Sequence, residues 1–309
     1  MENKMKILIC YFSGTGNTRM VVNKYVENLK SEEVETDLYK IETNDFGFDV
    51  TDYEMLGIAY PVHAFNAPSI ILDFAKSLPE CKGKRVFIVN TSGEPLRLNN
   101  ISSIKLCKVL KEKGYNVTNE YHYCMPYNII FRHTDNMAYK MWKTAQEVIP
   151  VDCKELLSGK YSLLDKVFMG SFIAWLFRIE HWGGRFNGKK YKVSENCIHC
   201  GKCVNICPTH NITLKDGEFH FGKNCLMCMR CSFLCPKNAI KIGLFNKWKV
   251  NGVYNFNNAN KFEDEVHKNY CKKSYERYFK ECKEKIAILH GEDLEREEQD
   301  EEIEETVKA

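Results

Sequence analysis

The sequence predicts an α/β protein in which a doubly wound parallel sheet precedes a small, cysteine-rich α+β domain. Two observations lead to this fold class. Strand-like and helix-like segments alternate through residues 1–157, as they do when helices join parallel strands. Eight of the 15 cysteines then fall within residues 197–235, in two runs of the same spacing. We expect an α/β domain at 1–157, a connecting helix at 158–189, a cysteine-rich domain at 190–243 and a C-terminal helical extension at 244–309.

The elements of the first domain follow from apolar patterning. The first apolar run, KILICYF at residues 6–12, is unbroken, as expected of a strand covered on both faces of a parallel sheet. Further strands are expected at residues 35–41, 55–60, 85–90 and 117–124. Helical spacing predicts helices at 17–30, 69–78, 101–113 and 134–157. Residues 42–52 barely suffice for a parallel crossover, so we expect the helix there to be short or absent.

Residues 160–182 are unusually apolar for a connecting segment. Apolar side chains cover nearly every side of a helix drawn through them, which predicts a helix buried between two domains. Contact with a second copy of the chain or with a membrane surface is the alternative. Gly183 and Gly184 are expected to end this helix. A later amphipathic helix is expected at 262–289, followed by an acidic, solvated tail.

The two cysteine runs are identical in spacing, C-x2-C-x2-C-x3-C-P, and they begin at Cys197 and Cys225. This is the pattern of bacterial two-cluster ferredoxins, in which three thiolates of a run hold one [4Fe–4S] cube and the fourth reaches the other cube. One cluster is therefore expected on Cys197, Cys200, Cys203 and Cys235. The other is expected on Cys225, Cys228, Cys231 and Cys207. Residues 207–214 also resemble 235–242, so the segment is an internal duplication.

Other uses of these cysteines fit the spacing less well. Zinc sites usually take two short pairs of ligands, which would leave two surplus cysteines in each run. Disulfide frameworks are typical of small secreted domains, whereas this chain has 309 residues. The seven remaining cysteines show no framework spacing and are expected to be reduced thiols in the cytoplasm, in a setting that would suit an anaerobe.

Charge is distributed unevenly along the chain. Residues 290–309 carry ten acidic and two basic side chains, whereas residues 183–250 carry twelve basic and three acidic ones. The basic region can offset the negative charge of thiolate-ligated clusters, and we favour this interpretation over nucleic-acid binding. An acidic redox partner that docks there is compatible with it. We expect no signal peptide, and the apolar run 167–177 is shorter than the roughly 20 residues of a membrane span.

A glycine-rich loop follows the first strand and opens the first helix. Glycines allow the tight turn, and the helix N-terminus favours an anion, so the loop predicts a phosphate cradle. Arg19 stands where a dinucleotide-binding motif has its third glycine, and no Walker lysine follows. An ordinary strand–helix turn is the alternative. The loop residues are Ser13, Gly14, Thr15, Gly16, Asn17 and Thr18.

This loop resembles the Ser/Thr-Gly-Thr-Gly-Asn-Thr loop that holds the phosphate of FMN in flavodoxins. With the cysteine runs, the whole chain resembles the flavodoxin–ferredoxin fusion family. The resemblance implies strand order 2-1-3-4-5 and FMN at the switch point between strands one and three. Two further loops would flank the flavin ring: Tyr60, Pro61, Val62, His63, Ala64, Phe65 and Asn66, and then Thr91, Ser92, Gly93 and Glu94. Tyr60 or Phe65 could stack on the ring, and residues 125–128 could form a wall between flavin and cluster.

These features predict an electron-transfer protein. FMN exchanges one or two electrons and each cluster exchanges one, so the chain would interconvert the two kinds of transfer. Redox donor and acceptor proteins, or a small-molecule acceptor, are the expected partners, and a homodimer could form through the apolar helix. The alternative is an FMN-dependent oxidoreductase that oxidises NAD(P)H or reduces a small substrate. Regulation through cluster sensing is a third hypothesis. His63 is interpreted as a packing residue, and no acid–base catalytic residue is assigned.

Overall fold

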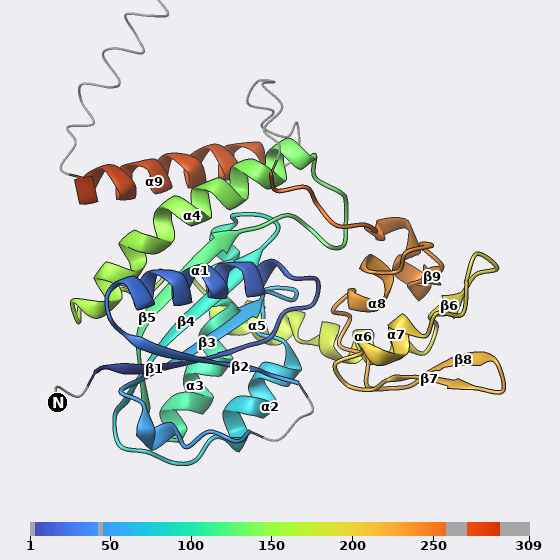
Figure 1. Ribbon diagram of the computed structural model, residues 1–309, viewed down its shortest axis with the longest axis horizontal. Helices are drawn as coiled ribbons and strands as arrows, with labels where there is room; N and C mark the ends of the chain where they lie inside the picture. Colours follow the sequence, from blue (N-terminus) through green and yellow to red (C-terminus); the bar gives the residue numbers. More distant parts are fainter. Residues whose placement is uncertain (1–3, 43–45, 258–270, 291–309) are drawn as a thin grey trace, which may run out of the picture.

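The structure is a computed structural model that describes residues 4–42, 46–257 and 271–290. Its centre is a parallel sheet of five strands in the order β2-β1-β3-β4-β5 (Figure 1), which confirms the predicted order. Each strand lies close to its expected position. The bounds are β1 Lys6–Tyr11, β2 Glu35–Lys40, β3 Met55–Pro61, β4 Lys84–Ser92 and β5 Tyr115–Cys124.

Helices cover both faces of the sheet (Figure 1). Side chains of β1 alternate between the faces: Ile7 and Ile9 join the core under one helical layer, and Leu8 joins the core under the other. The first layer contains α1 (Asn17–Ser31), α4 (Asp135–Leu157) and α9 (Lys272–His290). The second contains α2 (Ser69–Ser77) and α3 (Ile104–Glu112).

The connection after β2 is as short as expected. Between residues 46 and 54 it contains only the single 3-10 turn η1 (Val50–Asp52). The expected helix at 101–113 is divided, because the 3-10 segment η2 (Arg97–Ser103) precedes α3.

The prediction for residues 160–182 is wrong in three respects. Helix begins only at α5 (Gly170–Phe177) and α6 (Ile179–Gly188), so the segment before Gly170 is extended or turned. Gly183 and Gly184 lie inside α6 instead of ending the helix. The large side chains are exposed, Phe168 at 90% and Trp182 at 76%. The physical reason is that small residues of these helices, such as Ala174, face the protein.

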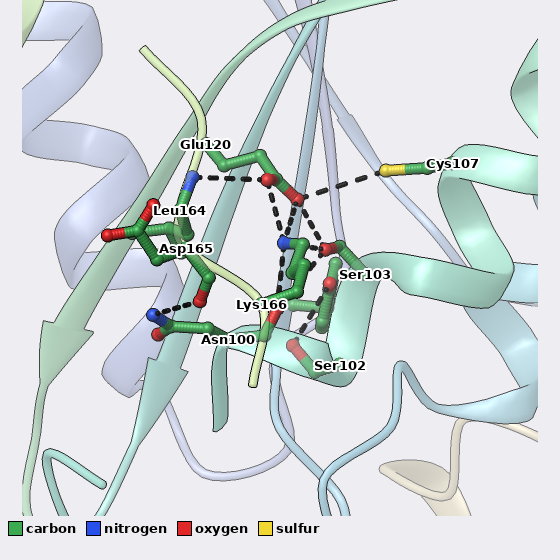
Figure 2. A network of polar contacts seen from close by, with 9 residues as sticks. Asn100, Ser102, Ser103, Cys107, Glu120, Leu164, Asp165 and Lys166 are labelled. Atoms are coloured by element: carbon green, nitrogen blue, oxygen red, sulfur yellow. Dashed lines mark hydrogen bonds and ion pairs between the residues drawn. The ribbon is translucent and has the colours of Figure 1, made fainter. Parts of the chain in front are cut away.

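A buried carboxylate anchors the segment before α5 to the sheet (Figure 2). Glu120 of β5 has a side chain that is only 2% exposed, and it forms an ion pair with Lys166 at 2.7 Å. It also accepts hydrogen bonds from the Leu164 backbone N–H at 3.2 Å and from the Ser103 hydroxyl. Lys166 Nζ donates to the carbonyl of Asn100 at 2.8 Å. These bonds fix where the chain leaves the first domain.

The cysteine-rich segment shows the expected duplication. Each half contributes one short helix, α7 (Lys202–Asn205) or α8 (Arg230–Phe233), and each helix follows a residue with positive φ, Gly201 or Met229. The short strands β6 (Lys192–Val193) and β9 (Ile240–Lys241) pair with each other, as do β7 (Ile212–Lys215) and β8 (Glu218–Phe221). The 3-10 segment η3 (Gly243–Trp248) follows.

The expected C-terminal helix is confirmed from Lys272 onward as α9. It packs on α4, where Lys285 forms an ion pair with the buried Asp152, and the Tyr278 hydroxyl accepts a bond from the Cys124 N–H at 3.1 Å. The expected start of the helix at 262–270 and the acidic tail beyond residue 290 lie outside the described residues.

Two further findings concern the described part of the chain. No disulfide links any of its cysteines. Within residues 4–42, 46–257 and 271–290, no helix has the combined length and apolar character that crossing a bilayer requires.

Candidate functional site

The eight cysteines of the two runs surround two cavities. The lining of the first cavity includes four cysteines that were expected to act together, Cys197, Cys200, Cys203 and Cys235. The lining of the second includes Cys207, Cys225, Cys228 and Cys231. Cys231 reaches both cavities. Each run therefore sends its fourth cysteine to the cavity of the other run.

Backbone N–H groups point at the sulfur atoms in the same way in both halves. The N–H of His199 lies 3.4 Å from Cys197 Sγ, and the N–H of Met227 lies 3.4 Å from Cys225 Sγ. A second pair of N–H groups bonds the fourth cysteine of each run, at 3.3 Å for Cys207 and 3.2 Å for Cys235. Such N–H···S bonds stabilise negative charge on sulfur and tune the potentials of iron–sulfur clusters.

Burial raises the pKa of four of these thiols, Cys203, Cys225, Cys228 and Cys231, and so makes them weaker acids. The pKa of Cys225 is raised to about 12, mainly by burial and in smaller part by the nearby Cys228 and Cys207. Binding of a metal centre requires thiolates, so the centre must displace protons and supply compensating positive charge. The cavities and the donor set fit a group that takes four thiolates.

The glycine-rich loop forms a turn with unsatisfied donors at the start of α1. Gly16 has φ of 120°, which favours glycine, and α1 has no side-chain cap at that residue. Ser13 Oγ accepts from the N–H of Gly16 at 3.2 Å and of Arg19 at 3.4 Å. In the part of the chain that the structure describes, the N–H groups of Thr15, Asn17 and Thr18 have no acceptor. Three free donors at a helix N-terminus fit a phosphate group.

Residues 125–128 lie directly over this loop. Asn17 Nδ2 donates to the carbonyl of Pro126 at 2.7 Å, and Asn128 Nδ2 donates to Thr15 Oγ1 at 3.4 Å. The carbonyl of Tyr127 in turn accepts from the Tyr254 hydroxyl at 2.7 Å. This segment therefore closes one side of the loop.

The loop after β3 contacts the connecting helices. Its residues 63–66 form a turn in which Ala64 and Phe65 have positive φ. Asn66 Nδ2 donates to the carbonyl of Ala174 at 3.1 Å, and the rings of Phe65 and Phe177 meet edge to face. Burial lowers the pKa of His63 to about 4, so this imidazole is neutral at neutral pH. Tyr60 is fully buried among core side chains.

The loop after β4 packs against Tyr127. A Cβ at Gly93 would overlap the ring of Tyr127, and the Tyr127 hydroxyl donates to the Glu94 carboxylate. Burial raises the pKa of Glu94. At the base of the loop, Thr91 Oγ1 lies 2.9 Å from Thr18 Oγ1, which joins this loop to the glycine-rich loop. The three loops therefore meet at the carboxyl edge of the sheet, where open α/β sheets bind ligands.

Sequence reasoning missed Arg230, which joins the glycine-rich loop to the cysteine-rich segment. Its side chain is 7% exposed and donates to the carbonyl of Ser13 at 2.7 Å and of Gly14 at 3.0 Å. It also forms an ion pair with Glu42 at 2.7 Å and donates to the Ile206 carbonyl at 2.9 Å. Its only sequence signal was a basic residue between two cysteines, which we counted as general charge compensation.

The ion pair itself is stable against protonation. Burial opposes ionisation of Glu42, but hydrogen bonds from Lys40 and Arg230 outweigh it and hold the pKa of this carboxyl below its usual range. Beside the ion pair, the two parts of the chain come into backbone contact. A Cβ at Gly14 would overlap the carbonyl oxygen of Cys228. The glycine-rich loop therefore lies directly against the second cysteine group.

Comparisons with known proteins agree with these two parts. Residues 196–239 match the family of 4Fe-4S dicluster domains. A match to a flavodoxin from the domain Archaea covers 50% of this chain and 99% of that flavodoxin, with 14% sequence identity and a TM-score of 0.34. The flavodoxin of Streptococcus pneumoniae TIGR4 is 15% identical over 50% of this chain and 98% of its own, with a TM-score of 0.37. No curated protein matches the sequence.

These TM-scores are too low to decide the fold, so the first domain is assigned from its own strand order and helical layers, which are flavodoxin-like. The class defined by the fold and the cysteine groups is an iron–sulfur redox protein with a flavodoxin-like domain. In architecture, a domain with the strand order of flavodoxins precedes a segment that matches 4Fe-4S dicluster domains.

Proposed function

We propose that this protein relays electrons between two [4Fe–4S] clusters and a bound FMN, and so interconverts one-electron and two-electron transfers. The observation that carries the proposal is the contact between the Gly14 backbone and the Cys228 carbonyl. It brings a residue of the candidate phosphate loop against a candidate cluster ligand. Redox donor and acceptor proteins, or a small-molecule acceptor, would complete the relay.

The residues that would hold each cofactor follow from the two cavities and the three loops. One cluster would take Cys197, Cys200, Cys203 and Cys235, and the other Cys225, Cys228, Cys231 and Cys207. The free N–H groups of Thr15, Asn17 and Thr18, within the loop 13–18, would bind the phosphate of FMN, and the loops 60–66 and 91–94 would lie beside its ring. When bound, FMN supplies two-electron chemistry and the clusters supply one-electron steps.

Arg230 would hold the candidate FMN site and the candidate cluster sites in a fixed position relative to each other. Its guanidinium holds two carbonyls of the glycine-rich loop and one of the cysteine-rich segment, and hydrogen bonds to a buried charge each contribute roughly 1.5–3 kcal/mol. Its positive charge also lies next to thiolates that would carry the negative charge of a cluster.

The proposal is tested by counting the centres and then separating them. Anaerobically purified protein should bind about eight irons and one FMN, as the two four-thiolate sites and single phosphate loop require. Gly14→Ala should push the glycine-rich loop away from Cys228 and slow electron transfer between flavin and clusters, measured by stopped-flow absorbance. Gly47→Ala is the matched control, because a Cβ there meets nothing within 4 Å.

Two results would contradict the proposal. Purified protein that contains zinc and no iron would show that the cysteines do not hold iron–sulfur clusters. An unchanged transfer rate in Gly14→Ala, with both cofactors bound, would show that electrons do not pass at this contact.

A further inference from the structure

The connecting helices α5 and α6 present a row of large apolar side chains to solvent. We call this row the apolar stripe. At its ends Phe168 is 90% exposed and Phe186 is 61% exposed, and every residue of the row is at least half exposed. Contiguous exposed apolar surface of this kind marks an interaction site. The stripe consists of Phe168, Phe172, Trp175, Ile179, Trp182 and Phe186.

The stripe has a regular helical spacing. Phe172 and Trp175 lie three residues apart in α5, and Ile179, Trp182 and Phe186 follow at intervals of three and four in α6, so the members within each helix share one face. Phe168 lies in the turn just before α5. The opposite face carries small buried residues, among them Gly170, Ala174 and Gly184. The arrangement is inverted relative to an ordinary surface helix, whose large apolar side chains face the core.

Packing on the inner face prevents the helices from turning the stripe inward. A Cβ at Gly170 would lie 2.8 Å from Ile101 Cγ2, and a Cβ at Gly188 would overlap the Cβ of Cys225. There is room on this side for glycine and alanine but not for phenylalanine or tryptophan. The stripe is thus held outward by the fold.

Exposed basic residues gather at one end of the stripe. Residues 161–192 contain six basic and two acidic side chains, a net charge of +4. Three of the basic residues, Arg185, Lys189 and Lys190, lie at one end of the stripe and are exposed. Lys190 Nζ lies 4.3 Å from the ring centroid of Phe186, so cation and aromatic ring are presented together.

We propose that the apolar stripe binds the surface of an anionic lipid bilayer, with α5 and α6 lying in the plane of the interface. Tryptophan and phenylalanine favour the boundary between head groups and acyl chains, and nearby lysine and arginine bind anionic head groups. A second copy of this chain would bring the same positive charge against it, which disfavours self-association through the stripe.

The inner face of the same helices makes this surface relevant to the redox site. Gly184 lies against Met227, Gly188 lies against Cys225, and Asn66 of the loop after β3 bonds to α5. The helices run from the edge of the sheet to the cysteine-rich segment (Figure 1). A bilayer bound at the stripe would therefore lie one helix away from the second cysteine group.

The test uses the full-length protein purified anaerobically with its cofactors. It is mixed with vesicles of phosphatidylcholine and phosphatidylglycerol, or of phosphatidylcholine alone, and sedimented. We expect binding to the anionic vesicles and a blue shift of tryptophan fluorescence, because Trp175 and Trp182 enter the interface. Sedimentation equilibrium without lipid reports the oligomeric state.

Variants identify the surface responsible. The triple variant Trp175→Ser, Ile179→Ser, Trp182→Ser should lose vesicle binding. A matched control carries Leu244→Ser, Val253→Ser and Ile288→Ser, which are 65%, 68% and 77% exposed and lie outside the stripe, and it should bind normally. Replacing Arg185, Lys189 and Lys190 by Gln should weaken binding to anionic vesicles about a hundredfold, since each basic residue contributes roughly fivefold.

Three results would overturn the proposal. The wild-type protein could fail to bind anionic vesicles. The stripe variant could bind as well as the control. Alternatively, the protein could form a dimer that only the stripe variant abolishes, which would assign the stripe to self-association. Far-UV circular dichroism confirms that each variant is folded before binding is compared.

Discussion

The sheet domain and the cysteine-rich segment are stabilised in different ways. Both faces of the sheet lie on extensive apolar cores, which include fully buried residues such as Ile9 and Ile58. The cysteine-rich segment has a separate core of four buried residues: Tyr191, Met229, Ile240 and Ile242. A core of this size contributes little free energy of folding, so the segment depends on what its cysteines bind and on its contacts with the sheet domain.

Removal of iron should produce the largest effect. Chelation under anaerobic conditions should unfold residues 190–243, because the eight cysteine ligands lose the metal that links them, while the sheet remains folded. Hydrogen exchange should show loss of protection in β6–β9 and unchanged protection in β1, β3 and β4. Full protection of the cysteine-rich segment after chelation would show that its small core is sufficient.

Matched core truncations should sharpen the contrast. Ile9→Ala in the sheet and Ile242→Ala in the cysteine-rich segment both remove a fully buried side chain. We expect Ile9→Ala to lower the free energy of unfolding of the sheet domain by about 4 kcal/mol, with or without iron. After chelation Ile242→Ala should have no effect, since its surroundings are already unfolded. Urea titrations followed by circular dichroism measure both, and an equal effect of Ile242→Ala in iron-free protein would contradict the comparison.

The ion pair of Glu120 with Lys166 in Figure 2 should contribute somewhat less to the free energy of unfolding than the buried Ile9 side chain does. Lys166→Met leaves the Glu120 carboxylate buried without its cation, and we expect the free energy of unfolding to fall by about 3 kcal/mol. Lys143→Met is the control, because its ion pair with Glu147 is exposed and contributes at most about 1 kcal/mol. Urea titration again gives both values. Equal effects of the two substitutions would show that the buried pair does not anchor the connecting segment.

Lowering the pH should reduce the free energy of unfolding of the sheet domain by a smaller amount than these substitutions. Burial lowers the pKa of His122 to about 4, below the value of about 6.5 in the unfolded chain. The folded state therefore binds fewer protons, and the stability that His122 contributes is lost as pH falls from 6.5 towards 4. The loss should be about 2 kcal/mol between pH 7 and pH 5. His122→Asn should reduce the slope of stability against pH in that interval, and an unchanged slope would contradict this assignment.

Sequence patterns predicted β1, β3 and β4 well because each contains an apolar run that is buried on both faces. The order of the strands came from the resemblance carried by residues 13–18, and the structure reproduces it. The spacing of the cysteines predicted which of them line each cavity, because three closely spaced ligands can follow one turn of backbone. Their role as ligands stays a prediction.

Patterning failed where both sides of a helix are apolar. In residues 160–182 the size of the side chains decides which side is buried. A pattern of apolar positions treats small and large apolar residues alike, so it could not predict that side. The small residues Gly170, Ala174 and Gly184 were the available signal. Arg230 was beyond reach for a different reason: its partners Ser13 and Glu42 lie more than 180 residues away, and nothing local indicates such a contact.

The hydrogen bonds of Arg230 to both parts of the chain have a consequence for the rate of the proposed electron transfer. With the guanidinium buried between the glycine-rich loop and the cysteine-rich segment, the two halves of the fusion meet without a hinge motion. Internal electron flow would then not wait for a diffusive search, and thickening the solvent with glycerol should leave its rate unchanged.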